Sequence, residues 1–244
     1  KLKLSGTAAA AIASVASIIV PIQMASQTWD DHDRSNRYTC RDFGQNYLNS
    51  MQEKGYPIVF TNGDNDTFPL WYNQDVEGVR TDTRVCNLSY LQTDWYIDQM
   101  RRPAYTSPSV PIKWNRLDYI SGTNEAIPVR PNLKQQVLDM YKENPEEARK
   151  QFGEDPFELK NILKYWVRAK DSQFHVIPTD TLYMTIDKAA VRRSGMMMPT
   201  DSIPDRMVIS LAGKEGLLKN DIMMLEMIAN CNWTRPLYVA VTVG

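Results

Sequence analysis

The sequence has no excess of basic residues. Its 244 residues carry 28 Lys and Arg against 29 Asp and Glu, and the basic side chains are scattered along the chain. Nucleic-acid binding depends on clustered positive charge that neutralises phosphates, so we expect no nucleic-acid partner. A hydrophobic content of 43% is typical of one globular domain, with room for a helical insertion.

Histidine and cysteine are scarce. Two histidines are too few to argue a Ser-His-Asp or Cys-His catalytic arrangement, and we expect His175, among apolar strand residues, to be a packed core side chain. Cys40, Cys86 and Cys231 lie far apart without a C-x-x-C pair, so neither a zinc site nor a disulfide framework is indicated. We interpret the cysteines as small apolar residues of the core.

Glycine motifs that bind phosphate are also missing. The chain has neither a Walker loop nor a G-x-G-x-x-G turn. Without such a cradle for phosphate groups, an ATP-dependent or nicotinamide-dependent enzyme is disfavoured. We expect no cofactor, apart from the divalent cation considered below.

One long stretch near the N-terminus has no charge at all. No charged residue occurs between Lys3 and Asp30, and residues 7–25 are rich in Ala, Ile and Val. A bilayer crossing needs about 20 such residues, so we expect residues 1–28 to form a transmembrane helix. A signal peptide and a buried soluble helix kinked at Pro21 are the alternatives.

The charges that flank this stretch indicate its orientation. Lys1 and Lys3 precede it, and an acidic segment follows it. Because positive charges stay preferentially in the cytoplasm, we expect residues 29–244 to form a domain on the other side of the membrane.

Helical and strand patterns alternate in the next part of the chain. They predict a helix at 39–52, a strand at 57–61, a polar turn at 62–66 followed by a helix, a strand at 84–89 and a helix at 94–102. Strand, helix, strand, helix at this spacing indicates a βαβ unit with parallel strands. We therefore expect an α/β fold, with a Rossmann-like parallel or mixed sheet behind the transmembrane helix.

The rest of the chain extends this pattern. It predicts an irregular excursion at 105–130 with one small hairpin, a helical insertion at about 131–170, strands at 175–177, 181–186 and 207–211, a helix at 220–229 and a strand at 236–241. Because that last strand runs almost to the final residue without a polar tail, we expect the sequence to be a piece of a larger membrane protein.

The polar turn at the end of the first strand is the main candidate site. Its carboxylates and amides lie where parallel sheets place their working loops, and their oxygen atoms suit a hard cation or sugar hydroxyls. Helix capping, for which Asp and Asn are preferred, is the alternative. With the nearby aromatic residues, which can stack on sugars, the candidate ligand-binding residues are Asn62, Gly63, Asp64, Asn65, Asp66, Trp71, Asp94 and Trp95.

A second polar cluster follows the uncharged stretch. Asp31, His32 and Asp33 put an imidazole among carboxylates, which makes them weaker candidates for a metal site. Such a cluster equally serves to end a membrane span and fix its orientation, with Trp29 anchored at the interface.

Several motifs together resemble a known family. They are WDDHDRS at 29–35, TNGDNDTFPLWY at 61–72, VEGVR at 76–80, RVCNLS at 84–89, TDWY at 93–96 and NWTRPLY at 232–238. The chain is similar to the bacterial multi-pass membrane proteins of the domain of unknown function 2723 family, which resemble protein O-mannosyltransferases and other glycosyltransferases of the GT-C type. The resemblance implies sugar transfer from a lipid-linked donor outside the cytoplasm. The family's catalytic carboxylate belongs to an early external loop, so no catalytic residue is assigned here.

Together these observations predict the soluble extracytoplasmic domain of a membrane glycosyltransferase, which assists acceptor or glycan binding and is not catalytic by itself. The expected partners are its own N-terminal transmembrane region, the membrane, and a glycan or protein acceptor. The expected location is the bacterial inner membrane, with the soluble domain in the periplasm. The alternative function is a non-enzymatic structural or interaction module.

Overall fold

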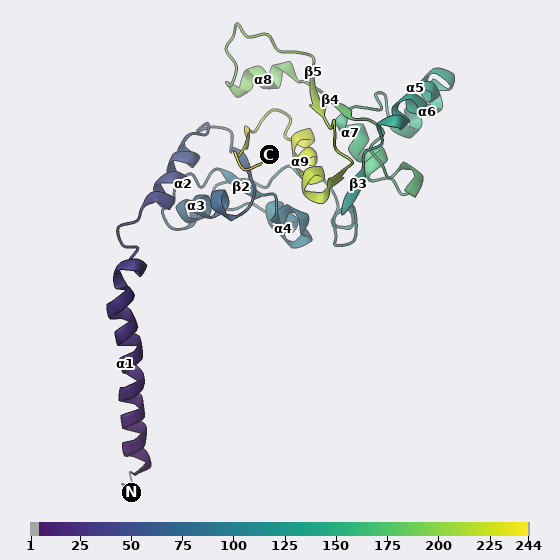
Figure 1. Cartoon of the computed structure of the whole chain (residues 1–244). Helices are drawn as coiled ribbons and strands as arrows, with labels where there is room; N and C mark the ends of the chain where they lie inside the picture. The colour runs from purple at the N-terminus through teal and green to yellow at the C-terminus, as the bar shows by residue number, and fades with distance from the viewer. Residues whose placement is uncertain (1–4, 244) are drawn as a thin grey trace. The chain divides into compact units, whose positions relative to one another are not determined.

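The computed structural model describes residues 5–243. The chain divides into two compact units, Lys1–Asp42 and Phe43–Gly244. Helices and small sheets are mixed throughout the second unit (Figure 1), so the α/β class expected from the sequence is confirmed.

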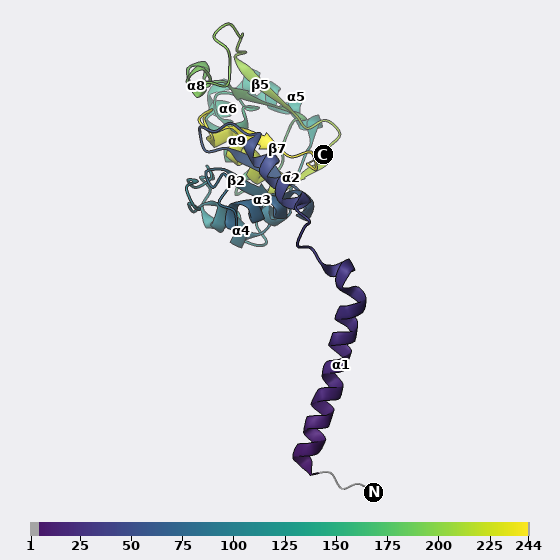
Figure 2. The same cartoon turned by 90° about the vertical axis from the view of Figure 1, so that its left-hand side faces the viewer.

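The first unit is dominated by one long helix, α1 (Gly6–His32). It begins at Ser5, whose side chain accepts a hydrogen bond from the Ala8 N–H at 3.3 Å. α1 is long and apolar enough to cross a membrane, and none of its residues is buried by the rest of the chain. Figure 2 shows its full length. Lys1 and Lys3, which carry the orientation argument, lie outside the described residues.

The second unit is built on a three-stranded parallel sheet. Its strands are β1 (Ile58–Thr61), β2 (Arg84–Asn87) and β7 (Leu237–Val239), in the order β2-β1-β7. Every residue of β1 and β2 is buried, as expected for parallel strands covered on both faces. The pairing of β1 with β2 through the intervening helix confirms the predicted βαβ unit.

Apolar residues on the two faces of β1 belong to different core clusters. Ile58 and Phe60 lie in the larger cluster, which extends to the helices of the last third of the chain. Val59 lies in a smaller cluster with Leu48 and Leu70. This division follows from the alternation of side chains along a strand.

Four helices are associated with the sheet: α2 (Thr39–Asn49), α3 (Asp64–Asp75), α4 (Asp94–Met100) and α9 (Lys219–Asn230). α2 and α3 approach each other at Gly44. A Cβ atom built on Gly44 would lie 2.5 Å from Asn73 Nδ2 and closer still to the carbonyl oxygen of Pro69. The lack of a side chain at Gly44 therefore allows this packing.

The strands outside the central sheet correct one prediction. β3 (Ala126–Pro128) pairs antiparallel with β6 (Gly216–Leu218), and β4 (Thr181–Thr185) pairs antiparallel with β5 (Arg206–Ser210). These ribbons are separate, so the described residues form no large Rossmann-like sheet. Burial explains the difference, because only alternate residues of β4 are buried, and such alternation is typical of strands with one solvated face.

The segment predicted as a helical insertion is helical. It contains η3 (Pro131–Leu133), α5 (Lys134–Glu143), α6 (Pro145–Phe152), α7 (Leu159–Asn161) and the π-helical turn η4 (Ile162–Val167). In both views α5 and α6 lie at a distance from α3 and α4 (Figures 1 and 2). Phe152 stacks on Trp166 with a centroid distance of 4.5 Å, which gives the segment apolar packing of its own.

The remaining elements are short helical turns and one helix that the sequence did not indicate. They are η1 (Tyr90–Gln92), η2 (Arg116–Asp118), η5 (Ser172–Phe174) and α8 (Lys188–Ser194). The strand predicted at 175–177 is reduced to a single bridge between Ile177 and Val129. His175 is half-buried, with Nε2 2.6 Å from Asn124 Oδ1, and is not the packed core side chain that we expected.

Candidate functional site

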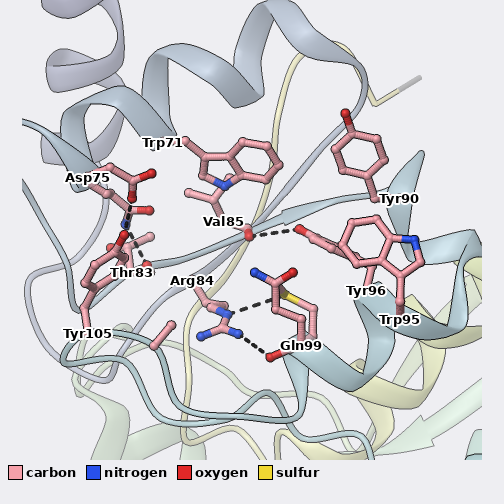
Figure 3. Close-up of a pocket in the computed structure, with 13 residues that line it drawn as sticks. Trp71, Asp75, Thr83, Arg84, Val85, Tyr90, Trp95, Tyr96, Gln99 and Tyr105 are labelled. Carbon is pink, nitrogen blue, oxygen red and sulfur yellow. Dashed lines mark hydrogen bonds between the residues drawn. The ribbon is translucent and has the colours of Figure 1, made fainter.

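An open cavity with aromatic walls lies beside β2. Its volume is about 740 Å³, and α3, β2, α4 and the following loop contribute to its lining. The aromatic residues that line it are Trp71, Tyr90, Trp95, Tyr96 and Tyr105, and the polar ones are Gln74, Asp75, Thr83, Arg84 and Gln99. Figure 3 shows Arg84 at the centre, Tyr90 and Trp95 on one side, and Asp75 and Tyr105 on the other.

The aromatic rings form a continuous series along one wall. Trp71 lies 6.1 Å from Tyr90 with nearly parallel planes, and Tyr90 lies 6.0 Å from Trp95. Trp71 and Tyr90 are partly buried, whereas the Trp95 side chain is 55% exposed. The series therefore runs from the interior to the rim and offers flat apolar faces at both depths.

Tyr96 fixes the base of this wall. Its hydroxyl accepts a hydrogen bond from the Asn87 N–H at 3.0 Å and donates one to the Val85 carbonyl at 3.5 Å. Burial raises the pKa of the Tyr96 hydroxyl, so this group stays neutral. The two bonds join α4 to β2 and hold the cavity's base in place.

Arg84 is a cation in the floor of the cavity. It is 4% exposed, its Nη2 donates to the Gln99 carbonyl at 2.9 Å, and its Nε contacts Met100 Sδ at 3.5 Å. Neither its Nη1 nor the nearby Thr83 hydroxyl has a hydrogen-bond partner among residues 5–243. Burial lowers the pKa of Arg84, and no carboxylate contributes to that shift.

The rim opposite the tryptophans is formed by Tyr105 and Asp75. Tyr105 has a left-handed backbone conformation with φ of 51°, and its hydroxyl donates a hydrogen bond to the Asp75 carboxylate. This bond raises the pKa of Tyr105. Both residues are exposed, so the Asp75 charge is at the opening of the cavity and is hydrated.

The predicted polar turn lies at the carboxyl end of β1, as expected from the strand pattern. Asn62, Asp64 and Asn65 are exposed, and Asn62 Oδ1 accepts a hydrogen bond from the Ser89 hydroxyl at 3.1 Å. Gly63 has φ of 78°, and its carbonyl accepts from Thr67 Oγ1 at 2.6 Å. The turn is not part of the cavity lining.

The Asp66 carboxylate makes a structural contact within the fold. Asp66 is 3% exposed, and its carboxylate accepts a hydrogen bond from the Thr242 hydroxyl. The N-cap residue of α3 is Gly63, and no side chain makes a capping bond, so the alternative that Asp64 or Asp66 caps α3 is wrong. Asp66 instead connects α3 to the residues that follow β7.

The other predicted site residues are divided between two places. Trp71 and Trp95 line the cavity. Asp94 does not line it, and lies 3.5 Å from Arg116 in an ion pair. The structure thus brings the two tryptophans together in one site and leaves the carboxylates of the prediction outside it.

The candidate metal residues lie at the end of α1. His32 Nδ1 is 3.0 Å from the Thr28 carbonyl oxygen, and Asp33 Oδ1 accepts from the Ser35 N–H at 2.9 Å. Hydrogen bonds from the side chain and from the backbone of Ser35 lower the pKa of Asp33. Within the described range 5–243, no three His, Cys, Asp or Glu side chains are grouped as a metal would need, so Asp31 does not complete a site with them.

The prediction missed the polar floor of the cavity. The signal was present, because Arg84 is a charged residue at the start of an otherwise apolar strand, and a buried charge needs an explanation. Tyr105 was also missed, since it belongs to a segment interpreted as irregular.

Comparison with known proteins gives one match. The family model described as TMEM260-associated domain 2 matches residues 40–244. The resemblance to the domain of unknown function 2723 family is therefore wrong, because the motifs that suggested it fall mostly within the range matched by another family. No curated protein and no solved structure matches the chain.

Proposed function

Because the chain belongs to the family of TMEM260-associated domain 2, we propose that its second unit is the carbohydrate-recognition part of a membrane protein. This family match suggests that the domain is part of a glycosyltransferase-related membrane protein. The observation that carries the proposal is the cavity with stacked aromatic walls beside β2. In this proposal the cavity holds the glycan or the glycosylated part of an acceptor.

The composition of the cavity suits a sugar ring. The faces of Trp71 and Trp95 provide flat apolar surface for the C–H face of a pyranose. The exposed side chain of Gln99 supplies an amide group for hydroxyls, whereas the amide nitrogen of Gln74 already donates to the Arg80 and Thr83 carbonyls. The volume of about 740 Å³ lies within the range of about 300–1,000 Å³ that is usual for small-ligand sites.

The same residues argue for binding without catalysis. Sugar transfer to an acceptor hydroxyl uses a carboxylate that is free to accept a proton, and Asp75 is the one carboxylate among the lining residues. Its side chain already accepts the Tyr105 hydrogen bond. We therefore assign the transfer of sugar from a lipid-linked donor to other parts of the protein, and assign recognition to this domain.

We further propose that the domain lies outside the cytoplasm, anchored by α1. Lys1 and Lys3 precede the apolar helix, and the positive-inside rule keeps such residues in the cytoplasm. On this orientation the domain lies in the periplasm if the membrane is a bacterial inner membrane, and in the lumen if it is a eukaryotic secretory membrane.

A thiol-labelling experiment tests this location. Cys40 is exposed, whereas Cys86 and Cys231 are buried. Burial raises the pKa of Cys86 to about 12, so this thiol stays protonated and unreactive. In sealed vesicles that display the extracytoplasmic face, a membrane-impermeant maleimide should label Cys40, and Cys40→Ser should remove the signal. Labelling that requires permeabilisation would contradict the proposed side.

Calorimetric titration of the full chain in detergent tests the binding function. The titrants are neutral oligosaccharides and glycosylated peptides. We expect saturable binding that Trp71→Ala weakens about tenfold, because loss of one stacking face costs roughly 1 kcal/mol or more. Tyr72→Ala is the matched control, since Tyr72 follows Trp71 on α3 and does not line the cavity. Equal binding by both variants, or no binding by the folded chain, would favour a structural or interaction module.

A further inference from the structure

The guanidinium of Arg84 is paired less completely than its burial requires. Its side chain is 4% exposed, and only Nη2 donates to an oxygen, the Gln99 carbonyl at 2.9 Å. Its Nη1 has no hydrogen-bond partner in the described part of the chain, and neither does the adjacent Thr83 hydroxyl. Two unused donors next to one cavity are unusual, because buried polar groups are nearly always satisfied.

A second cation lies near Arg84 and adds to its charge. Arg235 donates to the backbone carbonyls of Tyr56 at 2.7 Å and Ser109 at 2.8 Å. Burial, with a smaller contribution from the charge of Arg84, lowers the pKa of Arg235 to about 10. Both guanidiniums are thus held by neutral groups. Arg235 does not line the cavity, so Arg84 is the cation in its floor, and no carboxylate contributes to the pKa shift of Arg84.

Retaining such a charge costs free energy. Transfer of a charge from water into a protein interior is unfavourable unless an opposite charge accompanies it. The hydrogen bond from Arg84 Nη2 to the Gln99 carbonyl connects β2 to the end of α4 and uses one of the guanidinium donors. A neutral side chain with a donor could make a similar hydrogen bond to α4, so this bond alone does not explain why an arginine is buried here.

We propose that the cavity binds a sugar carrying an anionic group, with the anion at Arg84 and Thr83 and the ring against the tryptophans. The anion is either the carboxylate of an acidic sugar or the phosphate of a glycosyl phosphate. Both present oxygen acceptors to guanidinium and hydroxyl donors. This inference rests on the proposed carbohydrate-binding function and names the class of sugar that the same site prefers.

The arrangement in Figure 3 supports this placement. Arg84 lies between the aromatic wall, with Trp71 and Tyr90, and the loop that carries Tyr105. Arg84 and Thr83 both line the cavity, and Nη1 of Arg84 is buried, so a rotation of the guanidinium is what presents this donor to an anion in the cavity.

Asp75 is the lining group that opposes an anion. Its carboxylate is exposed at the rim and accepts the hydrogen bond from Tyr105. Hydration and salt screen the repulsion from an exposed charge more strongly than the attraction of a buried one. The attraction of Arg84 therefore prevails for an anion at the floor of the cavity.

Matched pairs of ligands test the inference on the full chain in detergent. The pairs are glucose with glucuronate and mannose with mannose 1-phosphate, and inorganic phosphate is titrated alone. We expect the anionic member of at least one pair to bind about tenfold more tightly than its neutral partner. The pair that shows the preference identifies carboxylate or phosphate as the recognised group.

Two variants locate the effect. Arg84→Gln keeps a side-chain amide donor and loses the charge, so the ratio of the anionic-sugar affinity to the neutral-sugar affinity should fall below about twofold. Arg84→Lys keeps the charge and should retain part of the preference. If Arg84→Gln fails to fold, the salt dependence of the wild-type chain replaces it, since added salt should weaken binding of the anionic sugar alone.

The outcomes separate the inference from the function on which it rests. Equal affinity for neutral and anionic sugars, with both bound, overturns the inference and leaves the recognition function standing. A preference that persists in Arg84→Gln also overturns it. Inorganic phosphate bound as tightly as mannose 1-phosphate contradicts the sugar-binding proposal, and no binding by any titrant refutes both.

Discussion

Replacement of Gly44 by alanine is expected to destabilise the second unit, although alanine is the better helix former. The new methyl group would lie 2.5 Å from Asn73 Nδ2 and closer still to the Pro69 carbonyl oxygen. It would also disturb the hydrogen bond that Asn73 Nδ2 donates to that carbonyl at 2.8 Å. Because one contact is with backbone, α2 and α3 must separate to admit the methyl group.

The magnitude follows from three contributions. Alanine gains about 1 kcal/mol in helix propensity, overpacking costs roughly 1–3 kcal/mol, and the disturbed hydrogen bond costs about 1 kcal/mol. The net loss is about 1–3 kcal/mol. For a unit of about 200 residues, a loss of 2 kcal/mol lowers Tm by about 6 °C.

Thermal unfolding followed by tryptophan fluorescence measures this effect, because α1 in a micelle contributes helical signal to circular dichroism but little to the fluorescence of the cavity tryptophans. Asn46→Ala is the matched control, since Asn46 is exposed on the same helix. The control should melt within about 2 °C of the wild type. A Gly44→Ala chain that melts at or above the wild-type temperature would refute the close approach of α2 and α3.

Three further predictions concern buried and exposed polar groups. Tyr96→Phe leaves the buried Asn87 N–H without its 3.0 Å acceptor, so chemical denaturation should show a loss of about 1–2 kcal/mol; an unchanged midpoint would contradict the bond. Burial raises the pKa of Glu226 above 4.5, so the ionised carboxylate destabilises the fold. This destabilisation develops as the pH rises from about 4.5 through the raised pKa. Glu226→Gln should therefore stabilise the fold at pH 7, and the gain should vanish below about pH 4.5, which denaturation at several pH values measures. Asp66→Ala should cost about 1–3 kcal/mol because it removes the acceptor of a buried hydrogen bond, whereas Asp64→Ala at an exposed position should cost less than about 1 kcal/mol; equal losses on denaturation would be inconsistent with their different burial.

The βαβ unit could be predicted because its determinants are local. The apolar run of β1 ends before the polar turn that contains Gly63, and the spacing of Leu70 and Trp71 indicates the helix that follows. The same patterns located the tryptophans, two of which line the cavity. Such local signals specify the type of each element and the relative direction of strands that are neighbours in the sequence.

The rest depends on contacts between distant residues. The hydrogen bond from Thr242 to Asp66 changes a predicted ligand into a structural group, and nothing near Asp66 in the sequence indicates it. The grouping of the strands into separate sheets likewise depends on which faces the rest of the chain covers. The alternating pattern of β4 and β5 fits any strand with one solvated face, so it does not indicate how the strands are grouped. The unsatisfied state of Arg84 emerges only when its surroundings are known.

The position of β7 has a consequence for biosynthesis. β1 is the central strand, yet one of its two neighbours is β7, which lies far along the chain, and the Gln52 N–H donates to the hydroxyl of Tyr238, 186 residues away. While the ribosome is still making the intervening segment, β1 and β2 have emerged with one edge of β1 unpaired. An exposed edge of this kind invites pairing with another chain. We therefore expect this edge of the nascent domain to need shielding until β7 has been made.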